Sequence, residues 1–176
     1  MVASDDKFMF LTSKIQGIKA RIKTNMGDIE LKFFPDKAPL HCYTFITRAE
    51  AGFYNNTKFH RVISGFMIQG GDPNTKTNNK DSYGSGGPMA MMPHEFNDTH
   101  HKRGILSTAR TSDVNAGAGS QFFIMHADNP GLNNQYTVFG EVTKGLEVVD
   151  KIATSKKDNR DRPLKPVIIK TIEVYK

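Results

Sequence analysis

Apolar and polar residues alternate in two neighbouring stretches near the start of the chain. From Ile18 to Lys23 every second residue is apolar, and the same alternation returns from Ile29 to Phe33. The short turn at residues 25–27, Asn-Met-Gly, separates them, so the pattern predicts an antiparallel hairpin with one face in solvent. Residues 1–17 have no sustained period and are interpreted as an N-terminal arm outside one domain that covers 18–176.

Two later stretches carry apolar residues at helical spacing. The first helix is expected to begin at Pro39 and to end near Gly52, and the second fits residues 145–154. Short apolar segments bounded by Gly, Pro, Asn or Asp predict strands at 57–63, 66–69, 105–109, 121–126, 137–142 and 166–175. Seven or eight strands with two helices favour a mainly β fold, an antiparallel barrel or sandwich, and closing the sheet is the simplest way to hide its edges.

Residues 73–93 interrupt this series of strands. The segment is rich in Asn, Gly and Pro, which oppose regular structure, so a long exposed loop is expected there. Loops of this length in compact domains are usually functional or mobile.

Charge and composition narrow the classes of function. The 176 residues include 24 Lys and Arg against 18 Asp and Glu, a net charge of +6, and much of the excess lies in residues 151–165. That stretch has no interleaved aromatic residues, so a solvated loop is favoured over a patch for an anionic partner, and nucleic-acid binding is not expected. No apolar run is long enough to cross a membrane.

Motifs for the commonest catalytic chemistries are absent. The chain contains no GxSxG elbow, no GxxxxGK[ST] phosphate loop and no HExxH pair among its six histidines. The single cysteine, Cys42, cannot form an intrachain disulfide and lies among apolar residues, which favours a buried, unreactive thiol. We therefore expect neither a metal site nor a cofactor.

One dense motif remains, FHRVISGFMIQGGD at residues 59–72. It resembles the signature of the cyclophilin-type peptidyl-prolyl cis-trans isomerases. GILSTA at 104–109, GSQFFI at 119–124 and TVFGEV at 137–142 follow in the order found in that family, so the resemblance covers residues 18–176. It implies a closed eight-stranded antiparallel β-barrel capped by two α-helices.

The resemblance also implies the site residues. Arg61 corresponds to the catalytic arginine of the family, and His60 beside it is expected to be a packed histidine near the site. The implied walls of the proline pocket are Phe66, Met67, Phe123 and Leu132. The residues that would hold the substrate backbone or line the groove are Gln69, Ala109 and Gln121, with Tyr136 at a position that is often His or Tyr.

The isomerisation that the resemblance implies needs none of the catalytic motifs that the chain lacks. Rotation of an X-Pro bond has a barrier of ~18–20 kcal/mol but makes and breaks no bond, so neither a nucleophile nor a cofactor is needed. In the twisted transition state the proline nitrogen can accept a hydrogen bond, which an always-protonated arginine can donate. The expected partners are proline-containing peptides and unfolded or partly folded proteins. A proline-binding scaffold without catalysis is the alternative, although Arg61 favours the enzyme.

Two departures from the family pattern affect the expected cyclosporin binding and the expected lining of the groove. The best-known members carry Trp at the pocket rim, where this chain has Gly131, so weak cyclosporin binding is expected. The segment from Arg110 to Ala118 is similar to that of bacterial members, and it leaves open whether Ala109 or Arg110 faces the groove. We expect a cytoplasmic monomer; a periplasmic or secreted protein is the alternative if a signal peptide has been removed.

Overall fold

Nine antiparallel strands form one sheet in this computed structural model, which describes residues 12–87, 92–111 and 118–176. The predicted hairpin is confirmed, with a turn at residues 25–26, and the other predicted strands are present with shifted ends. The strands are β1 (Lys19–Thr24), β2 (Gly27–Phe33), β3 (Thr57–Lys58), β4 (Arg61–Ile63), β5 (Met67–Gly70), β6 (Ile105–Arg110), β7 (Ala118–Met125), β8 (Val138–Lys144) and β9 (Ile168–Tyr175).

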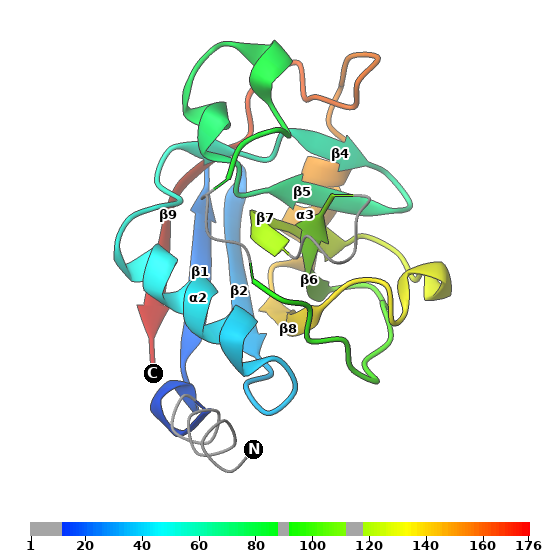
Figure 1. Ribbon diagram of the computed structural model, residues 1–176. Helices are drawn as coiled ribbons and strands as arrows, with labels where there is room; N and C mark the ends of the chain where they lie inside the picture. Colours follow the sequence, from blue (N-terminus) through cyan, green and yellow to red (C-terminus); the bar gives the residue numbers. More distant parts are fainter. Residues whose placement is uncertain (1–11, 88–91, 112–117) are drawn as a thin grey trace.

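The sheet curls into a half-barrel, so the prediction of a closed eight-stranded barrel is wrong (Figure 1). The strand order is β3-β9-β1-β2-β8-β6-β7-β5-β4, with β3 and β4 at its two edges. These edges are consecutive pieces of the single segment that the sequence predicted as one strand, 57–63. Phe59 N donates to Val167 O at one end of the sheet, and His60 N donates to Gln69 O at the other. The segment therefore changes partners between Phe59 and His60, and no ladder joins the edges.

Helices cover the sheet at three places in the described residues. They are α2 (Pro39–Glu50), α3 (Leu146–Ala153) and a short helical segment at residues 12–15, where the sequence predicted only the first two. The apolar side chains of α2, among them Phe45 and Ile46, pack into the main core with Phe122 and Phe139 of the sheet. None of the helices in the described part has both the length and the apolar composition needed to cross a bilayer.

The predicted long loop at 73–93 contains two short 3₁₀ turns, at Pro73–Lys76 and Lys80–Ser82. Cys42 is fully buried on α2, and its Sγ donates to Phe139 O at 3.2 Å. Burial raises the pKa of this thiol, in agreement with the predicted buried cysteine.

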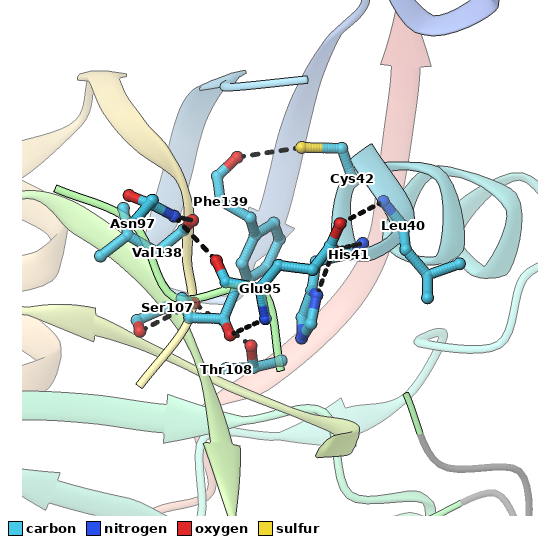
Figure 2. A network of polar contacts seen from close by, with 10 residues as sticks. Leu40, His41, Cys42, Glu95, Asn97, Ser107, Thr108, Val138 and Phe139 are labelled. Carbon is cyan, nitrogen blue, oxygen red and sulfur yellow. Dashed lines mark hydrogen bonds and ion pairs between the residues drawn. The ribbon is translucent and has the colours of Figure 1, made fainter. Parts of the chain in front are cut away.

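The amino end of α2 is capped by a side chain from a distant segment. Ala38 at the N-cap position has no side chain that could accept a hydrogen bond, and Glu95 takes that role. Its carboxylate accepts from Leu40 N at 3.2 Å and from His41 N at 2.8 Å, and it lies 2.6 Å from His41 Nδ1 (Figure 2). A negative charge here pairs with the positive end of the helix dipole as well as with two free N–H groups.

Replacing this cap tests its contribution to stability. We expect Glu95→Ala to lower the free energy of unfolding by about 1–2 kcal/mol, because two helix N–H groups lose their acceptor. Urea denaturation of the folded protein measures the change. The matched control is Glu50→Ala, an exposed glutamate at the other end of α2. Equal stability of the two variants would contradict the capping role.

Candidate active site

The alternation of side chains along four neighbouring strands builds the candidate site. In β4, β5, β6 and β7 one set of residues faces the main core, including Val62, Ile68, Leu106 and Phe122. Their neighbours in sequence point to the opposite face of the sheet, where a second, smaller apolar cluster forms. The members of this cluster that are buried are Met67, Ile105, Phe123, Met125 and Val138.

Strand register aligns the chemistry-bearing residues on that second face. Arg61 of β4 pairs with Gln69 of β5, Gln69 pairs with Phe123 of β7, and Phe123 pairs with Ser107 of β6. Because adjacent strands lie about 4.8 Å apart, these four residues form one row across the sheet. The arginine therefore stands two strands away from the buried phenylalanine.

A pocket of about 120 Å³ opens on this face. The strands supply part of its wall. Phe66, just before β5, and Leu132 and Tyr136, in and after the 3₁₀ turn Pro130–Leu132, supply the rest. Its lining contains nine of the residues singled out from the sequence: Arg61, Phe66, Met67, Gln69, Ala109, Arg110, Phe123, Leu132 and Tyr136. Both residues of the open alternative, Ala109 and Arg110, line the pocket.

Gln121 lies in an adjoining hollow of about 470 Å³, which shares Gln69, Ala109 and Arg110 with the pocket. The two hollows form one groove through these shared residues. His60 is outside both hollows and is buried, with 5% of its surface exposed.

A chain of hydrogen bonds runs from the arginine into the groove. Arg61 Nη1 lies 3.5 Å from Gln69 Oε1, and Gln69 Nε2 donates to Gln121 Oε1 at 3.0 Å. Gln121 Nε2 in turn donates to the carbonyl oxygens of Gly84 and Gly86, each at 2.9 Å. The guanidinium itself is exposed, and among the described residues no carboxylate lies within ion-pair distance of it. Its remaining N–H groups are therefore free to donate to a bound molecule.

A buried carboxylate holds the glycine segment that ends this chain. Asp72, fully buried, accepts hydrogen bonds from the backbone N–H groups of Asn74, Gly84 and Gly86. A side chain at Gly86 would collide with Asp72 Oδ1, so the close approach of this backbone requires glycine.

Arg110 and Tyr136 form the opposite rim of the pocket. The Arg110 guanidinium lies 4.5 Å from the centre of the Tyr136 ring, and its Nε donates to Gln135 O at 2.8 Å. This stacking holds a second cation at the mouth of the pocket. Gly131 is exposed in the 3₁₀ turn beside Leu132, which lines the pocket, and adds no side chain there.

A histidine that was not predicted from the sequence supports the pocket from behind. The His101 ring is buried and stacks on Phe123 with 6.1 Å between centroids, while its edge meets Tyr136 at 6.4 Å. His101 Nε2 lies 3.0 Å from Ser107 Oγ, in the same row as Arg61. The pair His100-His101 was visible in the sequence, but only the fold shows that one member packs behind the pocket.

Burial lowers the pKa of both histidines near the site. For His101 the loss of solvent is the main cause, and the hydrogen bond with Asn133 partly offsets it. For His60 burial again dominates, and the negative charge of Asp72 acts in the opposite direction. In the described part of the chain, no three His, Cys, Asp or Glu side chains are grouped so that they could hold a metal ion.

These pKa shifts predict that acid destabilises the protein. The fold holds the two imidazoles neutral, so the unfolded chain binds more protons once pH falls below the ordinary histidine pKa of about 6.5. The stability that depends on keeping the two imidazoles neutral is complete above that pH and is lost as the pH falls below it. Urea denaturation at pH 7.5 and 5.5 measures the decline, which should be smaller in His101→Gln. The exposed neighbour provides the control, His100→Gln, and an equal decline in both variants would refute the assignment.

Comparison with known proteins agrees with this geometry. The sequence profile described as "Cyclophilin type peptidyl-prolyl cis-trans isomerase/CLD" matches residues 19–174. Peptidyl-prolyl cis-trans isomerase-like 2 of Rhizopus delemar is 43% identical over 97% of this chain, which spans only 31% of that protein. Peptidyl-prolyl cis-trans isomerase-like 3 of Dictyostelium discoideum is 40% identical, and the match covers 88% of this chain and 93% of that protein. These relatives are eukaryotic, so a particular similarity to bacterial members is not supported.

A solved structure of a cyclophilin-type isomerase has the same fold as this chain. A cyclophilin-type isomerase of Cryptosporidium parvum, crystallised in the presence of the dipeptide Ala-Pro, superposes with a TM-score of 0.82 at 34% identity. The match covers 90% of this chain and 99% of that one. The profile, the relatives and the shared fold agree, and the chain belongs to the cyclophilin-type peptidyl-prolyl cis-trans isomerase family.

Proposed function

We propose that this chain accelerates cis-trans rotation of X-Pro bonds in peptides and in unfolded or partly folded proteins. The observation that carries the proposal is the juxtaposition of Arg61, a charged donor without a carboxylate partner among the described residues, with an apolar pocket. Family membership supports the same reaction.

The pocket would hold the proline ring and leave the other side of the peptide bond free to turn. Phe66, Met67 and Phe123 supply apolar walls, and Leu132 closes one side. Met67 and Phe123 are almost fully buried in the second cluster, so these walls are already in place before a ligand binds. A rigid, preformed pocket avoids the cost of ordering side chains on binding.

Arg61 would stabilise the transition state rather than the planar substrate. Amide resonance makes the proline nitrogen a poor acceptor in the ground state, whereas the twisted nitrogen has a lone pair that can accept a hydrogen bond. Raising a rate of ~10⁻² s⁻¹ to ~10–10³ s⁻¹ requires about 4–7 kcal/mol of differential stabilisation. One preorganised charged donor together with pocket binding can supply that amount.

The glutamine chain would position the substrate backbone in the groove. Gln69 and Gln121 are fixed by their mutual hydrogen bond, and Gln121 also donates to the carbonyl oxygens of Gly84 and Gly86. The backbone N–H groups of these two glycines donate in turn to Asp72. A peptide that follows the groove would pass from the proline pocket into the adjoining hollow. Residues next to the proline would then meet these polar groups.

Removing the donor tests the mechanism. We expect Arg61→Ala to lower kcat/KM for an X-Pro peptide by about 30- to 1000-fold, the effect of deleting one preorganised donor. A protease-free isomerisation assay by NMR exchange measures it, with circular dichroism to verify folding. Arg160→Ala, which removes an arginine with a 65% exposed side chain, should keep full activity. Full activity of folded Arg61→Ala would overturn the mechanism.

The best-known family members have Trp at the position of Gly131, and the lack of that side chain predicts weak binding of cyclosporin. Gly131→Trp should raise the affinity at least about tenfold, because an indole adds a large apolar surface and an N–H donor at the pocket mouth. Since the chain has no other Trp, fluorescence of the variant reports binding directly, and calorimetry compares it with the original chain. Gly131→Ala is the control for the backbone change. Tight binding by the original chain would disprove this prediction.

A further inference from the structure

A third hollow lies at the end of the molecule where two distant loops meet. The loop that contains the 3₁₀ turn Lys80–Ser82 and the loop at 156–167 stand side by side at the top of Figure 1. Arg162 Nη1 of one loop donates to Lys80 O of the other at 2.9 Å. Between them is a pocket of about 170 Å³, which we call the basic cleft and which shares no lining residue with the proline pocket.

The floor of the basic cleft is apolar. Phe59, Pro163 and Val167 line it, and all three are buried. Pro166 and the ring of Tyr83 form parts of its sides. A cavity of this size with such a lining suits one apolar side chain of a partner.

Cations surround this floor. Lys58, Lys80 and Arg162 line the cleft, and Arg160 and Lys165 belong to the same loop as Arg162. Lys58 Nζ donates only to neutral groups, Thr77 O at 3.2 Å and the Tyr83 hydroxyl at 3.0 Å. Within the described ranges, no carboxylate lies in ion-pair distance of Lys58 or Lys80.

The carboxylates of these loops are already engaged. Asp158 accepts from Arg162 Nε at 2.8 Å, and Asp161 pairs with Lys157 at 2.8 Å. Asp81 lies 3.9 Å from Arg160, at the limit of an ion pair. The rim therefore keeps an excess of positive charge that an acidic partner would complement.

Leu164 is an exposed apolar residue next to the cleft. The residue is 55% exposed, the highest fraction among the large exposed apolar residues of the described chain. It follows the buried Pro163 in the cleft wall, and its backbone N–H donates to Lys156 O at 2.8 Å, which fixes its place in the loop. Because it is adjacent to Pro163, which lines the cleft, a partner seated in the cleft could also remove this leucine from water.

We propose that the basic cleft binds an acidic peptide segment that inserts one apolar side chain between Lys58, Lys80 and Arg162 and covers Leu164. A free phosphate is disfavoured because Arg162, the residue best suited to grip one, already bonds to Asp158 and to Lys80 O. Nucleic acid is disfavoured because bases need open aromatic faces, and Lys58 Nζ lies over the Tyr83 ring, 5.4 Å from its centre.

The position of the cleft gives such docking a consequence for catalysis. Residues 58–60 line the cleft, and the next residue, Arg61, lines the proline pocket. A chain anchored in the cleft would therefore raise the local concentration of its own prolines near the groove.

Direct binding tests the proposal without using isomerase activity. The probe is a fluorescein-labelled peptide, Glu-Asp-Glu-Phe-Glu-Asp-Glu, which lacks proline, and fluorescence anisotropy at low and physiological salt gives its Kd. We expect binding that weakens with salt, and a Kd about tenfold higher for Lys80→Glu and for Leu164→Ser. The matched control is Lys151→Glu, which makes the same charge change at a lysine lining a different hollow, against β2 and α3. Its Kd should change less than twofold.

Further binding measurements distinguish an inserted apolar side chain from binding by charge alone and from binding of nucleic acid. Replacing the Phe of the probe by Ser should weaken binding about tenfold, because the apolar floor loses its occupant. Equal binding of the Phe and Ser peptides, or an equal loss in Lys80→Glu and Lys151→Glu, would overturn the proposal. Tighter binding of a single-stranded oligonucleotide, with the same sensitivity to Lys80→Glu, would also overturn it in favour of nucleic acid. Because the probe lacks proline, an inactive Arg61→Ala protein should bind it as the original chain does, so this result is independent of the proposed isomerase activity.

Discussion

The register between β4, β5, β7 and β6 is the constraint on which the candidate site depends. It places Arg61, Gln69, Phe123 and Ser107 in one row, so a shift of one residue in any strand would turn the row toward the core. The main core prevents such a shift, because Val62, Ile68, Leu106 and Phe122 occupy the other face of the same strands. The residues that fold the protein and those that would act on a ligand are thus alternate members of the same short strands.

Preorganisation of the groove follows from contacts behind it. His101 supports Phe123 and Tyr136, and Asp72 fixes the glycine segment to which Gln121 is bonded. Neither residue lines the pocket, yet both limit the motion of residues that do. A reaction that depends on one donor and on shape needs such support, since no covalent step selects the productive geometry.

Much of the fold and the site could be predicted from short stretches of sequence. Alternation at 18–33 predicted the first hairpin, and the family resemblance carried by the motif at 59–72 and the three later motifs implied the residues that the structure gathers around one pocket. The sequence could not predict that 57–63 divides between two sheet edges, because the first half pairs with β9, which is far away in sequence, whereas the second half pairs with the neighbouring β5. The support by His101 and the meeting of Lys80 with Arg162 were hidden for the same reason. Both depend on how remote segments pack, which periodicity does not report.

The division of 57–63 also bears on how the molecule behaves at high concentration. An open sheet has two edges whose unpaired backbone groups can recruit strands from other molecules. Here the edge strands pair over only two residues in β3 and three in β4, and each carries a cation, Lys58 or Arg61. Edges so short and charged are poor templates for a further strand. The short, charged edges therefore protect the sheet against edge-to-edge association even though the barrel is not closed.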